Sequence, residues 1–165
     1  MDELDFEYLN TFPVGDPVRK ALVFLKAGIS TFAEKNYNDE TTFKLIVAAL
    51  TQAPLLVPVE VDFDELLGEL NSRELPPDQE LHPKIESKPI WVTARFGDST
   101  EVIPMFTSRK EAAKGEKVPL MLYDPKDYFR ILTEIDMPAI INPFGETPFY
   151  MSQRFIKNVV MPQLQ

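Results

Sequence analysis

The sequence predicts an α/β fold of the α+β type, with a mixed β-sheet of about five to six strands covered by helices and preceded by a two-helix hairpin. Hydrophobic residues recur at helical spacing over residues 16–52, which predicts the hairpin. Over residues 53–165, short apolar runs bounded by turn residues alternate with helical patterns, as in a sheet covered by helices. The 165 residues are expected to form one domain, because a chain of this length can bury a core without disulfides or metal.

The helical hairpin begins with Asp16 and Pro17, a helix cap followed by proline at the first helical position. The apolar face of the first helix comprises Val18, Ala21, Leu22, Leu25, Ile29 and Phe32. Gly28 lies inside this pattern, and we expect the helix to bend or end near it, because glycine weakens a helix interior. Asn38 or Asp39 caps the second helix. Its apolar residues are Phe43, Ile46, Val47 and Leu50.

Short apolar runs predict the strands. Residues 55–59 form a buried strand, although Pro58 argues against full pairing because proline has no backbone N–H. Residues 90–95 and 101–106 predict a hairpin with glycine and aspartate in its turn. The later strands are residues 118–123, 139–142 and 149–151.

Three helices are predicted among and after these strands. Ser108, with Glu111 three residues later, predicts a capping box at the start of the first. Asp124 and Pro125 begin the second. Its inner face is formed by Tyr128, Ile131, Leu132 and Ile135. The third covers residues 152–160 and packs against the sheet through Phe155, Ile156, Val159 and Val160.

Two segments lack a sustained pattern. Residues 1–15 are acidic and aromatic and are expected to form a loosely docked N-terminal arm. Residues 60–89 are acidic and contain several prolines, which predicts an extended surface excursion. Residues 64–70 could form a short helix within this excursion.

Composition excludes several classes of function. The net charge of −9 would repel a phosphate backbone, which argues against nucleic acid as a partner. The chain has no cysteine, which excludes disulfides, thiol nucleophiles and thiolate metal sites. The N-terminus lacks a signal-peptide pattern, and no stretch is apolar for long enough to span a bilayer. We therefore expect a cytoplasmic protein that binds neither nucleic acid nor a membrane.

The motif P-x-F-T-S-x-x-E-A at residues 104–112 is the most specific pattern in the chain. Together with LLVPV at residues 55–59, Asn-Pro at residues 142–143 and the order of the elements, it resembles the SseB N-terminal domain family, named after enhanced serine sensitivity. The resemblance covers residues 17–160. It implies an α/β fold with a mixed sheet, and it brings no established catalytic residues with it.

The first candidate site comprises Thr107, Ser108 and Arg109, where a strand gives way to a helix. Free backbone N–H groups, the helix dipole, two hydroxyls and a guanidinium there could hold an anion. The simpler interpretation is a helix cap, which Ser108 and Glu111 already explain. Ser108 is a poor candidate nucleophile, because no GxSxG pattern surrounds it and the one histidine of the chain lies in the excursion.

The acidic excursion contains the residue types of a metal site without a convincing pattern. His82, with Glu80 and Glu86 nearby, is interpreted as a solvated loop residue. Three acidic residues lack the spacing of a calcium loop and are explained by helix capping, namely Asp62, Asp64 and Glu65. We therefore expect no metal, no cofactor and no catalytic residue.

The second candidate site is a surface for a partner protein, formed by Phe106, Phe144, Phe149 and Tyr150. It requires the rings of Phe144 and Tyr150 to project outward beside Phe106. The alternative is that these rings fill the core. Homodimerisation through a sheet edge or through the first helix is a further option that the sequence leaves open.

These observations favour a non-enzymatic, cytoplasmic interaction or regulatory domain of the SseB type with an unidentified protein partner. The alternative is a small-molecule or anion-binding protein, or an enzyme, centred on Thr107, Ser108 and Arg109. An exposed apolar strip would favour the first hypothesis. A concave pocket that combines those three residues with a carboxylate would favour the second.

Overall fold

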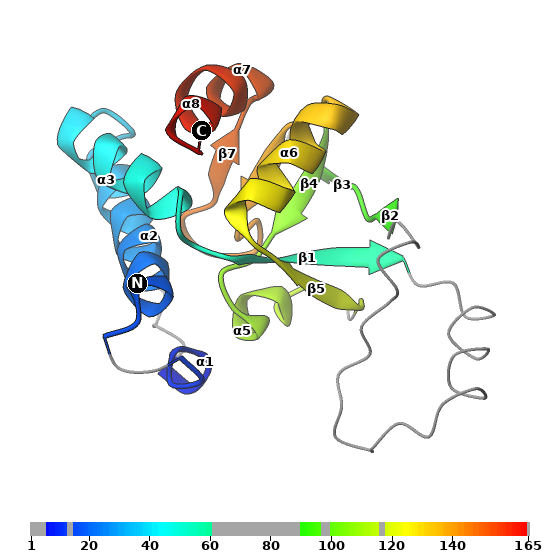
Figure 1. Ribbon diagram of the computed structural model, residues 1–165, viewed down its shortest axis with the longest axis horizontal. Helices are drawn as coiled ribbons and strands as arrows, with labels where there is room; N and C mark the ends of the chain where they lie inside the picture. The colour runs from blue at the N-terminus through cyan, green and yellow to red at the C-terminus, as the bar shows by residue number, and fades with distance from the viewer. Residues whose placement is uncertain (1–5, 13–14, 61–89, 97–99, 116–117, 165) are drawn as a thin grey trace.

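The computed structural model describes residues 6–12, 15–60, 90–96, 100–115 and 118–164 (Figure 1). Its helices are α1 (Phe6–Leu9), α2 (Pro17–Glu34), α3 (Glu40–Leu50), α5 (Arg109–Ala112), α6 (Pro125–Ile135), α7 (Gln153–Phe155), the π-helical turn η1 (Ile156–Val160) and α8 (Met161–Leu164). Its strands are β1 (Leu55–Glu60), β2 (Ile90–Trp91), β3 (Ala94–Phe96), β4 (Thr100–Met105), β5 (Leu120–Tyr123), β6 (Ala139–Ile141) and β7 (Phe149–Met151). Apart from residue 60, the predicted excursion with its short helix lies outside the described residues.

The strands form a sheet of three, in the order β2-β1-β5, and a sheet of four, in the order β3-β4-β6-β7. β4 and β6 run parallel, and the other pairs run antiparallel. An isolated bridge joins the two sheets, because the N–H groups of Leu56 and Phe106 each donate to the other's carbonyl oxygen at 2.9 Å. The predicted α+β class and mixed strand pairing are confirmed, with the strands divided between two joined sheets.

The strand predicted at residues 90–95 is divided, because β2 pairs with β1 whereas β3 pairs with β4. Pro58 explains the change of partner along β1. Leu56 bonds to Phe106 on one edge of β1, so the nitrogen of Pro58, two residues later, faces the same edge with no hydrogen to donate. The Pro58 carbonyl oxygen still accepts a hydrogen bond from the Val92 N–H at 3.0 Å. Pairing on this edge is therefore incomplete at Pro58, as the sequence predicted.

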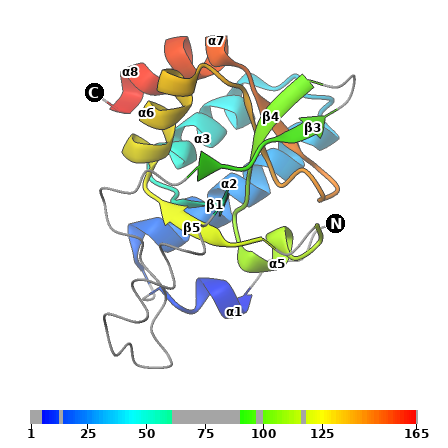
Figure 2. The ribbon, with the colours of Figure 1, turned by 90° about the vertical axis from the view of Figure 1, so that its right-hand side faces the viewer.

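Helices cover one face of the strands (Figures 1 and 2). Alternate strand residues such as Val57, Ile103 and Ile141 face these helices and form the main core. The opposite face carries a smaller cluster of Leu56, Phe106 and Ala112 beneath α5. Figure 2 shows α5 beyond the lower end of β4. The turn that contains α5 is therefore built on the face of the sheet away from the larger helices.

The predicted helical hairpin is present as α2 and α3. Asp16 caps α2, its side chain accepting a hydrogen bond from the Val18 N–H at 2.7 Å. The expected end of the helix near Gly28 is wrong, because α2 continues to Glu34. Gly28 instead lets α3 approach closely, since an added Cβ would lie 3.1 Å from Cγ1 of Ile46.

Asp39 caps α3 and accepts hydrogen bonds from both the hydroxyl and the N–H of Thr42, the latter at 3.0 Å. These hydrogen bonds hold the pKa of Asp39 below its ordinary value. Of the two alternatives for this cap, the structure therefore selects Asp39. Among the described helices, none is long and apolar enough to cross a membrane.

The inner face of α6 differs from the predicted one at its margin. Tyr128, Phe129 and Leu132 are fully buried, whereas Ile135 is 42% exposed. The buried face is centred between Tyr128 and Phe129, so Ile131 and Ile135 fall at its edge. The prediction that Ile135 faces inward is therefore wrong.

Both ends of the chain add to the core. In the N-terminal arm, α1 buries Leu9. The predicted last helix starts at its Ser152 cap and continues through η1 to the end of α8. Gln153 Nε2 donates to the carbonyl oxygens of Leu132, at 2.8 Å, and Met137, and so ties this helix to the end of α6.

Candidate functional site

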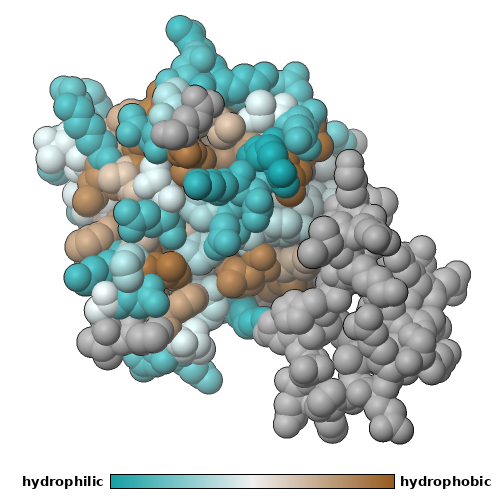
Figure 3. Space-filling model, in the orientation of Figure 1, coloured by the Kyte–Doolittle hydropathy of each residue, from teal (hydrophilic) through white to brown (hydrophobic). Residues whose placement is uncertain are grey.

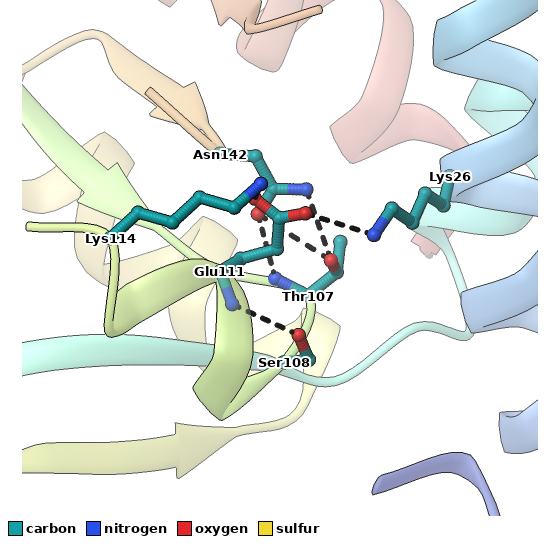
Figure 4. Close-up of polar contacts among 6 residues, drawn as sticks. All are labelled: Lys26, Thr107, Ser108, Glu111, Lys114 and Asn142. Atoms are coloured by element: carbon teal, nitrogen blue, oxygen red, sulfur yellow. Dashed lines mark hydrogen bonds and ion pairs between the residues drawn. The ribbon is translucent and has the colours of Figure 1, made fainter. Parts of the chain in front are cut away.

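Ser108 begins α5 in an extended backbone conformation, with φ −157° and ψ 164°. Its hydroxyl oxygen accepts a hydrogen bond from the Glu111 N–H at 3.2 Å, which confirms the predicted cap. The predicted capping box is wrong in its second half. The Glu111 carboxylate contacts two lysines and does not reach back to the backbone N–H at the start of the helix (Figure 4). Ser108 is buried, so its hydroxyl serves the helix and not the surface.

The Glu111 carboxylate is the charged centre of this region, with only 3% of its side chain exposed. Lys26 Nζ, from α2, donates a hydrogen bond to Oε1 at 2.9 Å (Figure 4). Lys114 Nζ lies 3.1 Å from Oε2 and forms an ion pair with it. A buried carboxylate requires such positive partners, because it has lost the solvation of water. This cluster therefore joins α5 to the helical hairpin.

Thr107 is linked to Asn142 by a reciprocal pair of hydrogen bonds (Figure 4). The Thr107 N–H donates to Asn142 Oδ1, and Asn142 Nδ2 donates to Thr107 Oγ1, each at 3.0 Å. Asn142 has φ 52°, a left-handed conformation that asparagine tolerates better than most residues. Its N–H donates to the Met105 carbonyl oxygen at 2.8 Å. The motif at residues 104–112 and the Asn-Pro pair are therefore in direct contact.

The structure separates the three residues predicted to hold an anion. Thr107 and Ser108 are buried and hydrogen-bonded within the protein, whereas Arg109 is exposed. The helix that follows them has four residues, so its dipole is small. The geometry favours the cap interpretation, and anion binding stays a prediction.

Sequence reasoning did not propose Lys26 or Asn142 as functional residues. Lys26 is 85 positions from Glu111 in the chain, so no local pattern connects the two. A weak signal exists, because Lys26 lies between Leu25 and Ile29 on the border of a buried helix face. For Asn142, the signal was the Asn-Pro pair itself.

Of the four aromatic residues predicted to bind a partner, only two are exposed. Phe144 is 49% exposed and Tyr150 is 46% exposed, whereas Phe106 and Phe149 are buried. Phe149 and Tyr150 are neighbours in β7 and so face opposite sides of the sheet, which explains the difference between them. Phe106 lies in the small cluster beneath α5 and cannot form part of an exposed surface.

The ring of Phe144 is held against the protein although half of it is exposed. It stacks on Phe106, with ring centroids 6.0 Å apart and an interplanar angle of 23°. Gly115 leaves room for it, since an added Cβ would lie 2.2 Å from Cε2 of Phe144. The exposed ring therefore has a fixed seat between Phe106 and Gly115.

The residues of the excursion that were weighed as metal ligands and set aside, including His82, lie outside the described residues. Within the part of the chain that the structure describes, no group of three or more histidine, cysteine, aspartate or glutamate residues is placed to hold a metal ion.

Comparison with known protein families gives a match. The profile of the family described as SseB protein N-terminal domain matches residues 25–158, which include the second half of α2, all of α3, α5 and the Asn-Pro pair. Comparison with the curated proteins and with the solved structures found no match. The family match spans most of the chain and agrees with the resemblance read from residues 104–112. The chain belongs to the SseB N-terminal domain family.

Proposed function

We propose that this chain is a non-enzymatic, cytoplasmic interaction or regulatory domain, which binds a partner protein through the exposed rings of Phe144 and Tyr150. The observation that carries the proposal is the fixed seat of Phe144. A rigid, half-exposed aromatic ring loses little conformational entropy on binding, and aromatic residues dominate the binding energy of protein interfaces.

The family motif supports this proposal, because its polar residues serve the turn that carries Phe144. Thr107 holds Asn142 two residues before the ring, and Phe106 stacks on the ring itself. Ser108 and Glu111 are likewise engaged inside the protein. The motif thus acts as a scaffold for an exposed aromatic residue, a role that needs no catalytic chemistry.

The proposal is tested by a pull-down from lysate of the native host, with wild type beside the double variant Phe144→Ala, Tyr150→Ala. A matched control is Phe24→Ala, Tyr37→Ala, which removes two rings of similar exposure, 50% and 53%, from the helical hairpin. Circular dichroism first establishes that all three proteins are folded.

We expect wild type and the control to retain the same protein and the Phe144, Tyr150 variant to lose it. Equal retention by all three proteins would show that the aromatic surface is not the binding site. If nothing is retained specifically, thermal stabilisation by small anions, with Arg109→Ala as the comparison, tests the alternative hypothesis.

A further inference from the structure

The outer edge of β5 presents backbone hydrogen-bonding groups away from the sheet. Within the described residues, β5 pairs only with β1. The Val59 N–H donates to the Pro119 carbonyl oxygen at 2.9 Å, so the backbone groups of Pro119, Met121 and Tyr123 face β1. Because backbone groups alternate along a strand, those of Leu120 and Leu122 point to the opposite, outer edge. Figure 1 shows β5 at the border of the three-stranded sheet.

The residues of β5 lack the sequence features that protect natural sheet edges. Residues 118–123 contain no charged residue, and the nitrogen of Pro119 faces β1, where it does not block the outer edge. Leu122 is 50% exposed. In Figure 3, apolar surface appears near the centre of the visible face, in the region of β5 and α5. An unprotected apolar edge of this kind is a site for pairing with another strand.

The edge of β7, the last strand of the four-stranded sheet, differs. β7 has three residues and follows Pro148, so it offers outward backbone groups only at Tyr150. Short edges next to proline are typical of edges that do not pair. Of these two edges, that of β5 is therefore the better candidate for strand addition.

We propose that β5 pairs antiparallel with β5 of a second copy of this chain, about a two-fold axis at Met121. In this register Leu120 exchanges hydrogen bonds with Leu122 of the second copy, and Leu122 exchanges them with Leu120 of that copy. The outward groups of both chains are then satisfied by one symmetry operation, because Leu120 and Leu122 lie symmetrically about Met121. This interface shares no residue with the proposed aromatic surface.

A second copy fits this edge better than a charged peptide would. The cross-strand pairs are Leu120 with Leu122 on one face and Met121 with itself on the other, so each pair is apolar. The opposing force is the repulsion between two chains of net charge −9, which salt screens. Association should therefore strengthen as the ionic strength rises.

Disulfide cross-linking tests the register, since the native chain has no cysteine. At the axis, Met121 and its counterpart form a non-hydrogen-bonded pair with Cα atoms about 4.5 Å apart, within the range of a disulfide. The two copies of Leu122 lie diagonally, about 7–8 Å apart, which is beyond the usual Cα separation of a disulfide. We expect Met121→Cys to form a covalent dimer with diamide and Leu122→Cys to stay monomeric. Failure of Met121→Cys to cross-link, or equal cross-linking of both, would overturn this pairing.

Sedimentation equilibrium of the full chain tests the dimer without cross-linking. The apparent mass of wild type should approach twice that of one chain as concentration rises. Leu122→Lys should raise the dissociation constant of the dimer at least about tenfold, because a charge at the edge prevents pairing. Leu45→Lys is the matched control on α3, where the leucine is 42% exposed, and it should leave the constant unchanged. A wild type that stays monomeric, or a Leu122→Lys dimer as strong as wild type, would contradict the proposal.

Discussion

The hydroxyl of Tyr128 lies in the core, where it donates to the carbonyl oxygens of Leu50 and Ala53 at 3.2 and 2.9 Å. Burial raises the pKa of Tyr128 well above its ordinary value of 10.0. Below pH 10.0 both folded and unfolded chains keep this proton, so the stabilisation is fully present. Above that pH the unfolded chain loses the proton and the folded chain keeps it, so stability falls as pH rises.

Tyr128→Phe should therefore lower the free energy of unfolding at neutral pH by about 1–3 kcal/mol, because two carbonyl oxygens lose their donor. The gap between wild type and variant should narrow above pH 10.0, where only the wild type loses the contribution of this hydroxyl. Urea unfolding from neutral to alkaline pH measures both effects. If the difference in free energy of unfolding between wild type and variant stays constant with pH, the Tyr128 hydroxyl does not have a raised pKa in the folded protein.

Single residues also show where sequence reasoning was incomplete. Alternation along a strand requires Phe149 and Tyr150 to face opposite sides, so the sequence could have excluded a shared surface. The neighbouring sequence could not show that Phe106 is buried and Phe144 is exposed. Their exposure depends on the position of α5 and on the stacking of the two rings.

At the scale of elements, α5 depends strongly on its cap, because a helix of four residues has few internal hydrogen bonds. Ser108→Ala should lower stability by about 0.5–2 kcal/mol, since the Glu111 N–H loses its acceptor. Thermal unfolding measures the change, with Ser152→Ala as a matched control, because that cap accepts from the Phe155 N–H at 3.1 Å. An unchanged melting temperature for Ser108→Ala would show that the cap contributes nothing to stability.

Elements were predictable where the determining contacts are local. The apolar period of α2 and its Asp16 cap lie within one short stretch of chain, and both predictions are confirmed. The division of the strand at residues 90–95 and the continuation of α2 past Gly28 were not predictable, because each depends on a distant segment. In the candidate site, the cap at Ser108 was predictable because its hydrogen bond joins residues three positions apart. The contact of Lys26 with Glu111 was not predictable, because the two residues are 85 positions apart.

At the scale of the whole molecule, the contact between Lys26 and Glu111 joins the helical hairpin to the small cluster beneath α5, on the opposite face of the sheet. Both side chains are largely buried, with 13% and 3% exposed. Breaking a buried ion pair is costly because the remaining charge loses its partner, whereas replacing both members with apolar residues can be nearly neutral. The pair should therefore couple the stability of two distant parts of the fold.

A double-mutant cycle tests this coupling. Glu111→Leu should cost about 3 kcal/mol, because Lys26 then loses its buried carboxylate, and Lys26→Met should cost less, because Glu111 keeps Lys114. The double variant should be more stable than the sum of the two losses implies, with a coupling energy of about 1–3 kcal/mol from urea unfolding. The control cycle uses Glu40 and Lys44, an ion pair with side chains 82% and 73% exposed, and should give about 0.5 kcal/mol or less. Equal coupling in both cycles would mean that burial adds nothing to the Lys26–Glu111 contact.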